Sequence, residues 1–217
     1  MLAFSTILLL FLSNTLASGS NITQYGTDVV EVRNIELKQR SYSYNLILDH
    51  SIHQRYQDSF DYFIGVPSEV FTKIPGLTFI VHHTKPMLYR LSFQALCTVS
   101  TRDSNGYLRF LIDDRVLISN YLLPNNDQRQ KSAPELGDSV LQIDHRGGGV
   151  LYSGGSPGTG LACLKWDDVY MREGTHLVEV AGRAGSGVLR VIGGQLSVDL
   201  IQYDSTANIQ LPFPIIR

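Results

Sequence analysis

The chain has 217 residues, of which 43% are hydrophobic, 10% aromatic and 18% charged, and its formal net charge is −2. The apolar content argues against a disordered chain, and 19 glycines with 8 prolines are too few for collagen or a low-complexity chain. The near-neutral charge argues against a dedicated nucleic-acid binder. At about 100–200 residues per domain, the length predicts a single domain.

The first residues predict the compartment. Residues 2–12 (LAFSTILLLFL) are apolar, and small residues suited to signal-peptidase cleavage follow, after Ala17 or Gly19. Because a membrane span needs about 20 apolar residues, this pattern is typical of a cleaved secretory signal over residues 1–19. A buried strand or a signal anchor is the alternative. We therefore expect a secreted, extracellular protein with no membrane span after cleavage, whose residues 20–217 form one β-sandwich domain.

Two further features fit secretion. Asn21 begins the motif Asn-Ile-Thr just after the expected cleavage site, which predicts N-glycosylation. The chain holds 2 cysteines, Cys97 and Cys163. In an oxidising compartment such a pair predicts a disulfide. Two buried thiols that pack as small hydrophobic groups are the alternative.

In chain order, weak alternation first suggests strands around residues 30–37 and 44–48, then a polar loop over residues 50–58, then a strand around residues 77–81. The clearest strand spans residues 88–100, where every second side chain is apolar, as in a half-buried antiparallel strand. Asn105-Gly106 then predicts a hairpin turn.

The remaining segments continue in the same way. The side chains of residues 107–112 alternate as in a strand, and Asp113-Asp114 predicts a second tight turn. Residues 116–119 form the strand that returns from this turn. Residues 124–160 have little periodicity and hold 8 of the 19 glycines, which is typical of a long binding loop. Strands follow at 166–171, 176–181, 188–192 and 196–200, with a turn expected at Gly193-Gly194. This spacing, best defined over residues 77–203, predicts an all-β protein, an antiparallel β-sandwich.

Aromatic and acidic side chains are the candidate binding residues. Trp166 and two tyrosines that we expect to be exposed, Tyr107 and Tyr152, are suited to stack on a sugar or anchor a protein interface. Packing in the core or at a sheet edge is the alternative for Trp166. Asp113 and Asp114 carry the loop carboxylates that calcium prefers, and ordinary turn chemistry is the competing interpretation.

Patterns for catalysis mostly fail. Residues 154–158 match G-x-S-x-G, but Pro157 has no N–H to donate to an oxyanion hole. A hydrolase would need Asp144, His145 and Asp168 to converge. The histidines at 50, 53, 82 and 83 fit solvated side chains better than zinc ligands, which need a third ligand and fixed geometry. We therefore assign no catalytic residue, no metal ligand and no cofactor, with calcium kept as an alternative.

Three segments resemble a known superfamily. Residues 87–93 (MLYRLSF), 108–113 (LRFLID) and 169–178 (VYMREGTHLV) are similar to strands of the jelly-roll domain shared by complement globular heads and tumour necrosis factor ligands. The resemblance covers roughly residues 77–203. It implies a jelly-roll sandwich, a homotrimer and a protein partner.

The resulting hypothesis is a secreted, non-enzymatic binding or adhesion module that recognises an extracellular protein through loops on a rigid sandwich. A carbohydrate-binding, lectin-like module is the first alternative. A secreted hydrolase is a more distant one.

Overall fold

The computed structural model describes residues 47–58, 63–154, 156–207 and 209–217. The expected signal (1–19), Asn21 and the strand suggested around residues 30–37 lie outside the described residues. The described elements are β1 (Ile47–Tyr56), β2 (Phe63–Gly65), β3 (Thr72–His83), β4 (Met87–Val99), β5 (Asn105–Ile112), β6 (Arg115–Ile118), β7 (Tyr121–Pro124), α1 (Arg129–Ser132), the 3-10 helix η1 (Pro134–Leu136), α2 (Val140–Asp144), β8 (Val150–Tyr152), β9 (Leu161–Met171), β10 (Gly174–Ala184), β11 (Leu189–Tyr203) and β12 (Ile215–Ile216).

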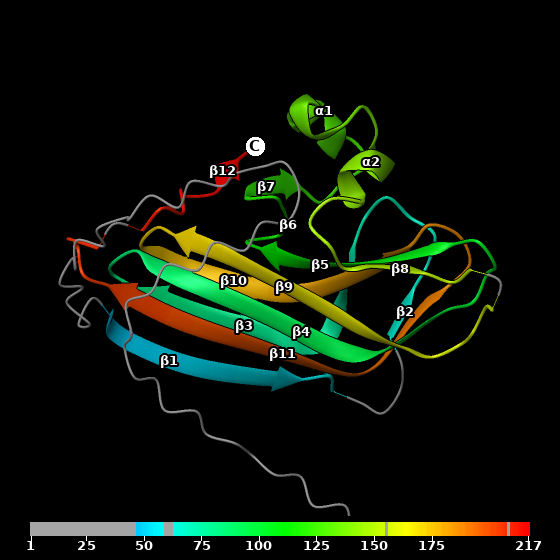
Figure 1. Cartoon of the computed structure of the whole chain (residues 1–217), viewed down its shortest axis with the longest axis horizontal. Helices are drawn as coiled ribbons and strands as arrows, with labels where there is room; N and C mark the ends of the chain where they lie inside the picture. The colour runs from blue at the N-terminus through cyan, green and yellow to red at the C-terminus, as the bar shows by residue number, and fades with distance from the viewer. Residues whose placement is uncertain (1–46, 59–62, 155, 208) are drawn as a thin grey trace, which may run out of the picture. The chain divides into compact units, whose positions relative to one another are not determined.

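The long strands form two packed sheets (Figure 1). Sheet A has the order β1-β11-β4-β9, with β2 also on β11, and sheet B has the order β12-β7-β6-β5-β10-β3, with β8 on β5. The antiparallel pairs are nested: β1 pairs with β11, β3 with β10, β4 with β9 and β5 with β6. Such a wrapped set of eight strands in two sheets is a jelly roll. The predicted all-β antiparallel sandwich is therefore confirmed.

Strand β4 shows how alternation builds the core. Leu91, Phe93 and Cys97 are buried between the sheets, as their period of two predicts. Strand β3 behaves in the same way, with Leu77 and Phe79 in the same cluster. The intervening side chains leave one face of each strand free to meet solvent or other elements.

The predicted hairpin at Asn105-Gly106 is wrong. These residues lie inside β5, and the chain passes from β4 in sheet A to β5 in sheet B through residues 100–104. Gly106 allows close packing instead of a turn, because a Cβ there would lie 2.8 Å from Leu189 Cδ1 and the leucine side chain would have to shift. The other tight turn is confirmed: Asp113 and Asp114 have φ of 53° and 63°, as a two-residue hairpin of the primed type requires.

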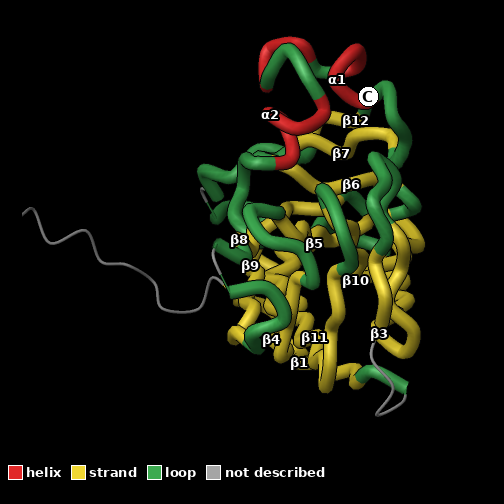
Figure 2. Tube along the Cα trace, turned by 90° about the vertical axis from the view of Figure 1, so that its right-hand side faces the viewer, coloured by secondary structure: helices red, strands yellow, loops and turns green. Residues whose placement is uncertain are grey.

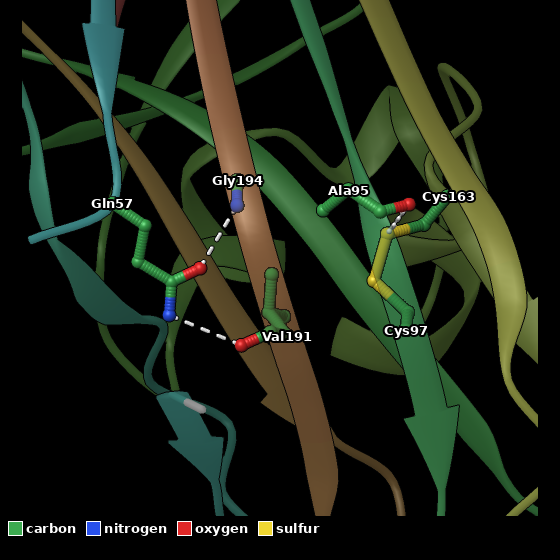
Figure 3. The surroundings of a disulfide bond; sticks show 6 residues. All are labelled: Gln57, Ala95, Cys97, Cys163, Val191 and Gly194. Carbon is green, nitrogen blue, oxygen red and sulfur yellow. Dashed lines mark hydrogen bonds between the residues drawn. A yellow bond between two sulfur atoms is a disulfide. The ribbon is translucent and has the colours of Figure 1, made fainter. Parts of the chain in front are cut away.

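Two further expectations need correction. Residues 50–56 form part of β1 instead of a loop, and their polarity reflects an edge strand whose side chains are mostly exposed. Gly193-Gly194 is not a turn, because β11 continues through it with a register shift against β4 between Ile192 and Gln195. Gln57 closes this bulge: its side chain donates to the Val191 carbonyl (3.1 Å) and accepts from the Gly194 N–H (3.0 Å) (Figure 3).

The predicted long loop over residues 124–160 is interrupted by short elements. It contains α1, η1, α2 and β8, and the helices lie beside sheet B on the side away from sheet A (Figure 2). We call residues 125–149, between β7 and β8, the helical insert. A second apolar cluster fills the space beneath this helical insert, from Tyr107 and Leu111 of β5 to Leu136 and Ile143. Strand β5 is consequently buried on both faces.

The disulfide is formed. Cys97 of β4 and Cys163 of β9 are bonded, with their Cα atoms 5.7 Å apart (Figure 3). Both lie in the core between the sheets. The bond fastens β9, an outer strand of sheet A, to its neighbour at the point where the chain returns from the helical insert.

Candidate binding face

The outer face of sheet A presents the most exposed aromatic ring of the long strands. Alternation in β9 turns Cys163 and Lys165 inward and Trp166 outward, and the Trp166 side chain is 62% exposed. The register places Trp166 opposite Ser92 of β4, which in turn lies opposite Ser197 of β11. The indole therefore has two serine side chains in line with it on the neighbouring strands. Trp166 is therefore exposed on an edge strand of sheet A and not buried in the core, and its role in binding stays a prediction.

A hollow of about 180 Å³ lies beside the indole; its lining residues are Ser92, Phe93, Gln94, Leu164, Trp166, Gln195 and Ser197. Gln94 and Gln195 are opposite one another in the register, and the Gln94 amide donates to Gln195 Oε1 at 2.9 Å. The hollow thus combines one aromatic wall with a floor of amides and hydroxyls. Such a surface can bind a partner but holds no acid–base pair.

Exposed apolar side chains lie on the same face of the same sheet. Those that the register places on the face of Trp166 are Ile52, Tyr56, Leu96 and Leu164. One row further along, Arg90 and Asp168 form an exposed ion pair with a nitrogen–oxygen distance of 3.5 Å. Exposed ion pairs contribute at most about 1 kcal/mol to stability. We call the outward-facing residues of β1, β4, β9 and β11 the binding face.

Buried charges behind β9 hold Trp166 in place. Lys165 points inward, where its ammonium contacts Asp167 Oδ2 at 2.5 Å and donates to the carbonyls of Gly147 (2.6 Å) and Trp166 (3.0 Å). Burial lowers the pKa of Lys165 and raises the pKa of Asp167, because both charged forms lose water. The strand that carries the indole is therefore tied to the end of the helical insert.

The two turn aspartates are engaged with other side chains. Asp113 accepts from His176 Nδ1 at 2.8 Å and from the Leu177 N–H at 2.9 Å. Asp114 forms an ion pair with Lys73 at 2.5 Å. The carboxylates thus stabilise the β5–β6 turn against β10 and β3. Within the described ranges, no group of three or more His, Cys, Asp or Glu residues is arranged to hold a metal ion.

The two candidate tyrosines, Tyr107 and Tyr152, differ in exposure. Tyr107 is fully buried, so the expectation that it is exposed is wrong: β5 is covered by the helical insert, and the Arg183 guanidinium lies 4.2 Å from the ring centroid. Burial raises the pKa of Tyr107. Tyr152 is exposed as expected, and it donates to Asp103 Oδ1 at 2.9 Å. Tyr152 lies on the short strand β8, which pairs with β5 of sheet B.

The residues proposed for a hydrolase do not converge. Asp144 is fully buried beneath the helical insert, where Arg129 Nε donates to it at 2.9 Å and Arg183 Nε at 2.8 Å. Asp168 lies on the binding face of the opposite sheet. Sequence reasoning missed both arginines, because nothing in their local sequence distinguishes a buried arginine from a solvated one. The cluster fixes the insert to sheet B and leaves no free carboxylate for catalysis at Asp144.

Three of the four histidines considered for zinc, His53, His82 and His83, are hydrogen bonded. His83 Nε2 lies 2.6 Å from the Tyr89 hydroxyl and its Nδ1 2.7 Å from the Lys85 carbonyl oxygen. His53 is hydrogen bonded to Ser51, and His82 to Thr175.

No helix in the part of the chain that the structure describes is long and apolar enough to cross a membrane.

Comparisons with known proteins find likenesses among solved structures alone. No protein-family model matches the chain, and no curated protein matches it. Among solved structures, the chain is similar to Eiger TNF from S. frugiperda, with 10% identity and a TM-score of 0.37, over 75% of this chain and 99% of that chain. The fold class rests on the strand pairing described above.

Proposed function

We propose that the chain is an extracellular, non-enzymatic binding module that assembles with further copies of itself through the binding face and recognises a protein partner. The observation that carries the proposal is the Trp166 side chain, 62% exposed on a sheet face. Tryptophan is enriched among the residues that dominate protein interfaces. The disulfide between Cys97 and Cys163 fits an oxidising compartment. The number of copies, three, comes from the sequence resemblance described above.

The energetics favour covering this face. An aromatic side chain buries about 150–250 Å², so covering the exposed part of Trp166 removes on the order of 100–150 Å² from water. At about 25 cal/mol per Å², this contributes roughly 3 kcal/mol at each contact. Neighbouring Leu164 and Leu96 add apolar area, and the serines and glutamines offer hydrogen bonds. The loops at the ends of the sandwich and the helical insert then remain for the partner.

Light scattering coupled to gel filtration tests the proposal on the secreted protein at tens of micromolar. We expect a mass of three chains for the intact protein and of one chain for Trp166→Glu, because a buried carboxylate would lack a partner. Leu141→Glu is the matched control, since Leu141 is exposed on α2, away from sheet A. A monomeric intact protein, or a Trp166→Glu variant that keeps its mass, would contradict the proposal.

A glycan-binding function is the second candidate, and the hollow beside Trp166 is the observation that favours it. An indole wall with amide and hydroxyl groups offers both stacking and hydrogen bonds to a sugar ring. A glycan array probed with the intact protein tests this function. The array is read with and without a chelator that removes calcium. Binding that Trp166→Ala abolishes, by a protein that stays monomeric, would move the assignment from self-association to sugar recognition.

A further inference from the structure

The segment after β11 leaves sheet A and ends on the edge of sheet B. We call residues 204–217 the tail. Its last strand, β12, pairs in parallel with β7, with Ile215 opposite Tyr121 and Ile216 opposite Leu122 (Figure 1). Strand β12 is the outermost strand of that sheet. The tail therefore covers the backbone N–H and C=O groups that an edge strand would otherwise present.

Hydrogen bonds to the tail backbone define a docking site on the β6–β7 turn. Asn120 makes three hydrogen bonds: its carbonyl accepts from the Ile215 N–H at 3.0 Å, and its side-chain amide donates to the carbonyls of Pro212 (3.3 Å) and Phe213 (3.4 Å). The Leu122 carbonyl accepts from the Arg217 N–H at 3.2 Å. This is recognition of an extended peptide by strand addition.

Side chains add sequence selectivity. The Phe213 ring is stacked on Tyr170 of β9, with centroids 5.0 Å apart and planes at 16°. The Arg172 guanidinium lies 4.2 Å from the centroid of the same ring. Stacking and cation–π contacts of this kind contribute about 0.5–1.5 kcal/mol each. The site thus fits an aromatic residue followed, two and three positions later, by β-branched residues.

The tail can leave without opening the core. None of its described residues is buried, and Ile216 is 63% exposed. The strand beneath it behaves differently, because Leu122 and Leu123 of β7 are buried. The turn that begins the tail is held by local bonds, from Thr206 to the Asp204 carboxylate. Detachment therefore costs the tail contacts alone, as in the local opening of a segment of low stability.

We propose that this edge is a peptide-binding site that also accepts the same tail from a second copy of the chain, so that two copies can exchange their tails. The sequence that fits the site is present once in each copy, and exchange conserves every contact that the site makes. Within one copy the tail has an effective concentration near the millimolar range. Exchange therefore requires neighbours held close together, or a copy whose own tail cannot dock.

A complementary pair of variants tests the proposal. Both copies carry Trp166→Glu, so that association through the binding face does not contribute. The first copy also carries Phe213→Ala and Ile215→Pro, which remove the stacked ring and the N–H bonded to Asn120 and leave its docking site free. The second copy also carries Asn120→Gly and Tyr170→Ala, which disable its site and leave its tail free. Glycine keeps the turn, because Asn120 has φ of 64°.

Light scattering should show one chain for each copy alone and two chains for the mixture at 100 µM. A fluorescent peptide, LPFPIIR, should bind the first copy at least tenfold more tightly than it binds the Trp166→Glu chain with an intact tail, since the cis tail competes. Thermal melts confirm that each copy is folded, and Asn120→Gly alone serves if Tyr170→Ala unfolds the second copy. A mixture that stays monomeric overturns the proposal, whether or not the peptide binds.

Discussion

Replacing Asp144 with asparagine should separate the helical insert from sheet B. The Asp144 carboxylate accepts hydrogen bonds from Arg129 and from Arg183, whose Nη2 lies 2.5 Å from Oδ2. All three side chains are at least 95% buried. An asparagine amide can accept from one guanidinium, but its NH₂ group faces the donors of the other. Because removing one partner of a buried ion pair costs about 3–5 kcal/mol, we expect a loss of that size.

Urea unfolding at 25 °C, followed by far-UV circular dichroism and by the fluorescence of the single tryptophan, measures this loss. For a domain of this size, about 3–5 kcal/mol corresponds to a melting temperature lower by roughly 6–20 °C. Asp168→Asn is the matched control, because Asp168 belongs to an exposed pair with Arg90 and should cost at most about 1 kcal/mol. Equal and small losses in the two variants would refute the view that the buried cluster fixes the insert.

Two further outcomes are expected. The double variant Cys97→Ser, Cys163→Ser should lose about 4 kcal/mol of unfolding free energy in the chain-entropy model, given the 66-residue separation; an unchanged urea midpoint would contradict this. Burial, with nearby His176, lowers the pKa of His83 below 6.5. A neutral buried histidine favours the folded state above the unfolded pKa, so stability should fall as pH drops below about 6.5. A melting temperature measured from pH 7.5 to 5.0 checks this, and His83→Gln should flatten the curve; parallel curves would count against it.

Sequence reasoning succeeded where one face of a strand meets the core. The alternation of Leu91, Phe93 and Cys97 identified β4, and the paired aspartates at 113 and 114 identified a turn whose backbone needs positive φ. It also nominated Trp166 as a candidate binding residue; the side chain is exposed, and binding by it stays a prediction. These signals are local, so a single sequence carries them.

The remaining features depend on contacts between distant segments. Asn105-Gly106 has the composition of a hairpin turn, but the Leu189 side chain packs against Gly106 and β5 joins the other sheet. Tyr107 and Arg183 belong to strands whose outer faces become interior only when the helical insert folds over them. The docking site for the tail requires Asn120 and Tyr170 from different sheets. No periodicity within one segment records such pairings.

The bulge at Gly193 and Gly194 shifts the alternation of inward and outward side chains in β11 by one residue. Before it, the odd-numbered Leu189 and Val191 face the core, and after it the even-numbered Leu196 and Val198 do so. Deleting one of the two glycines would remove the extra residue and restore a regular ladder, in which Leu196 and Val198 keep their partners on β4 and still face the core. The extra residue therefore serves Gln57 and not the core: its deletion should cost the hydrogen bonds of Gln57 to the Val191 carbonyl and the Gly194 N–H while the pairing of the sheet persists.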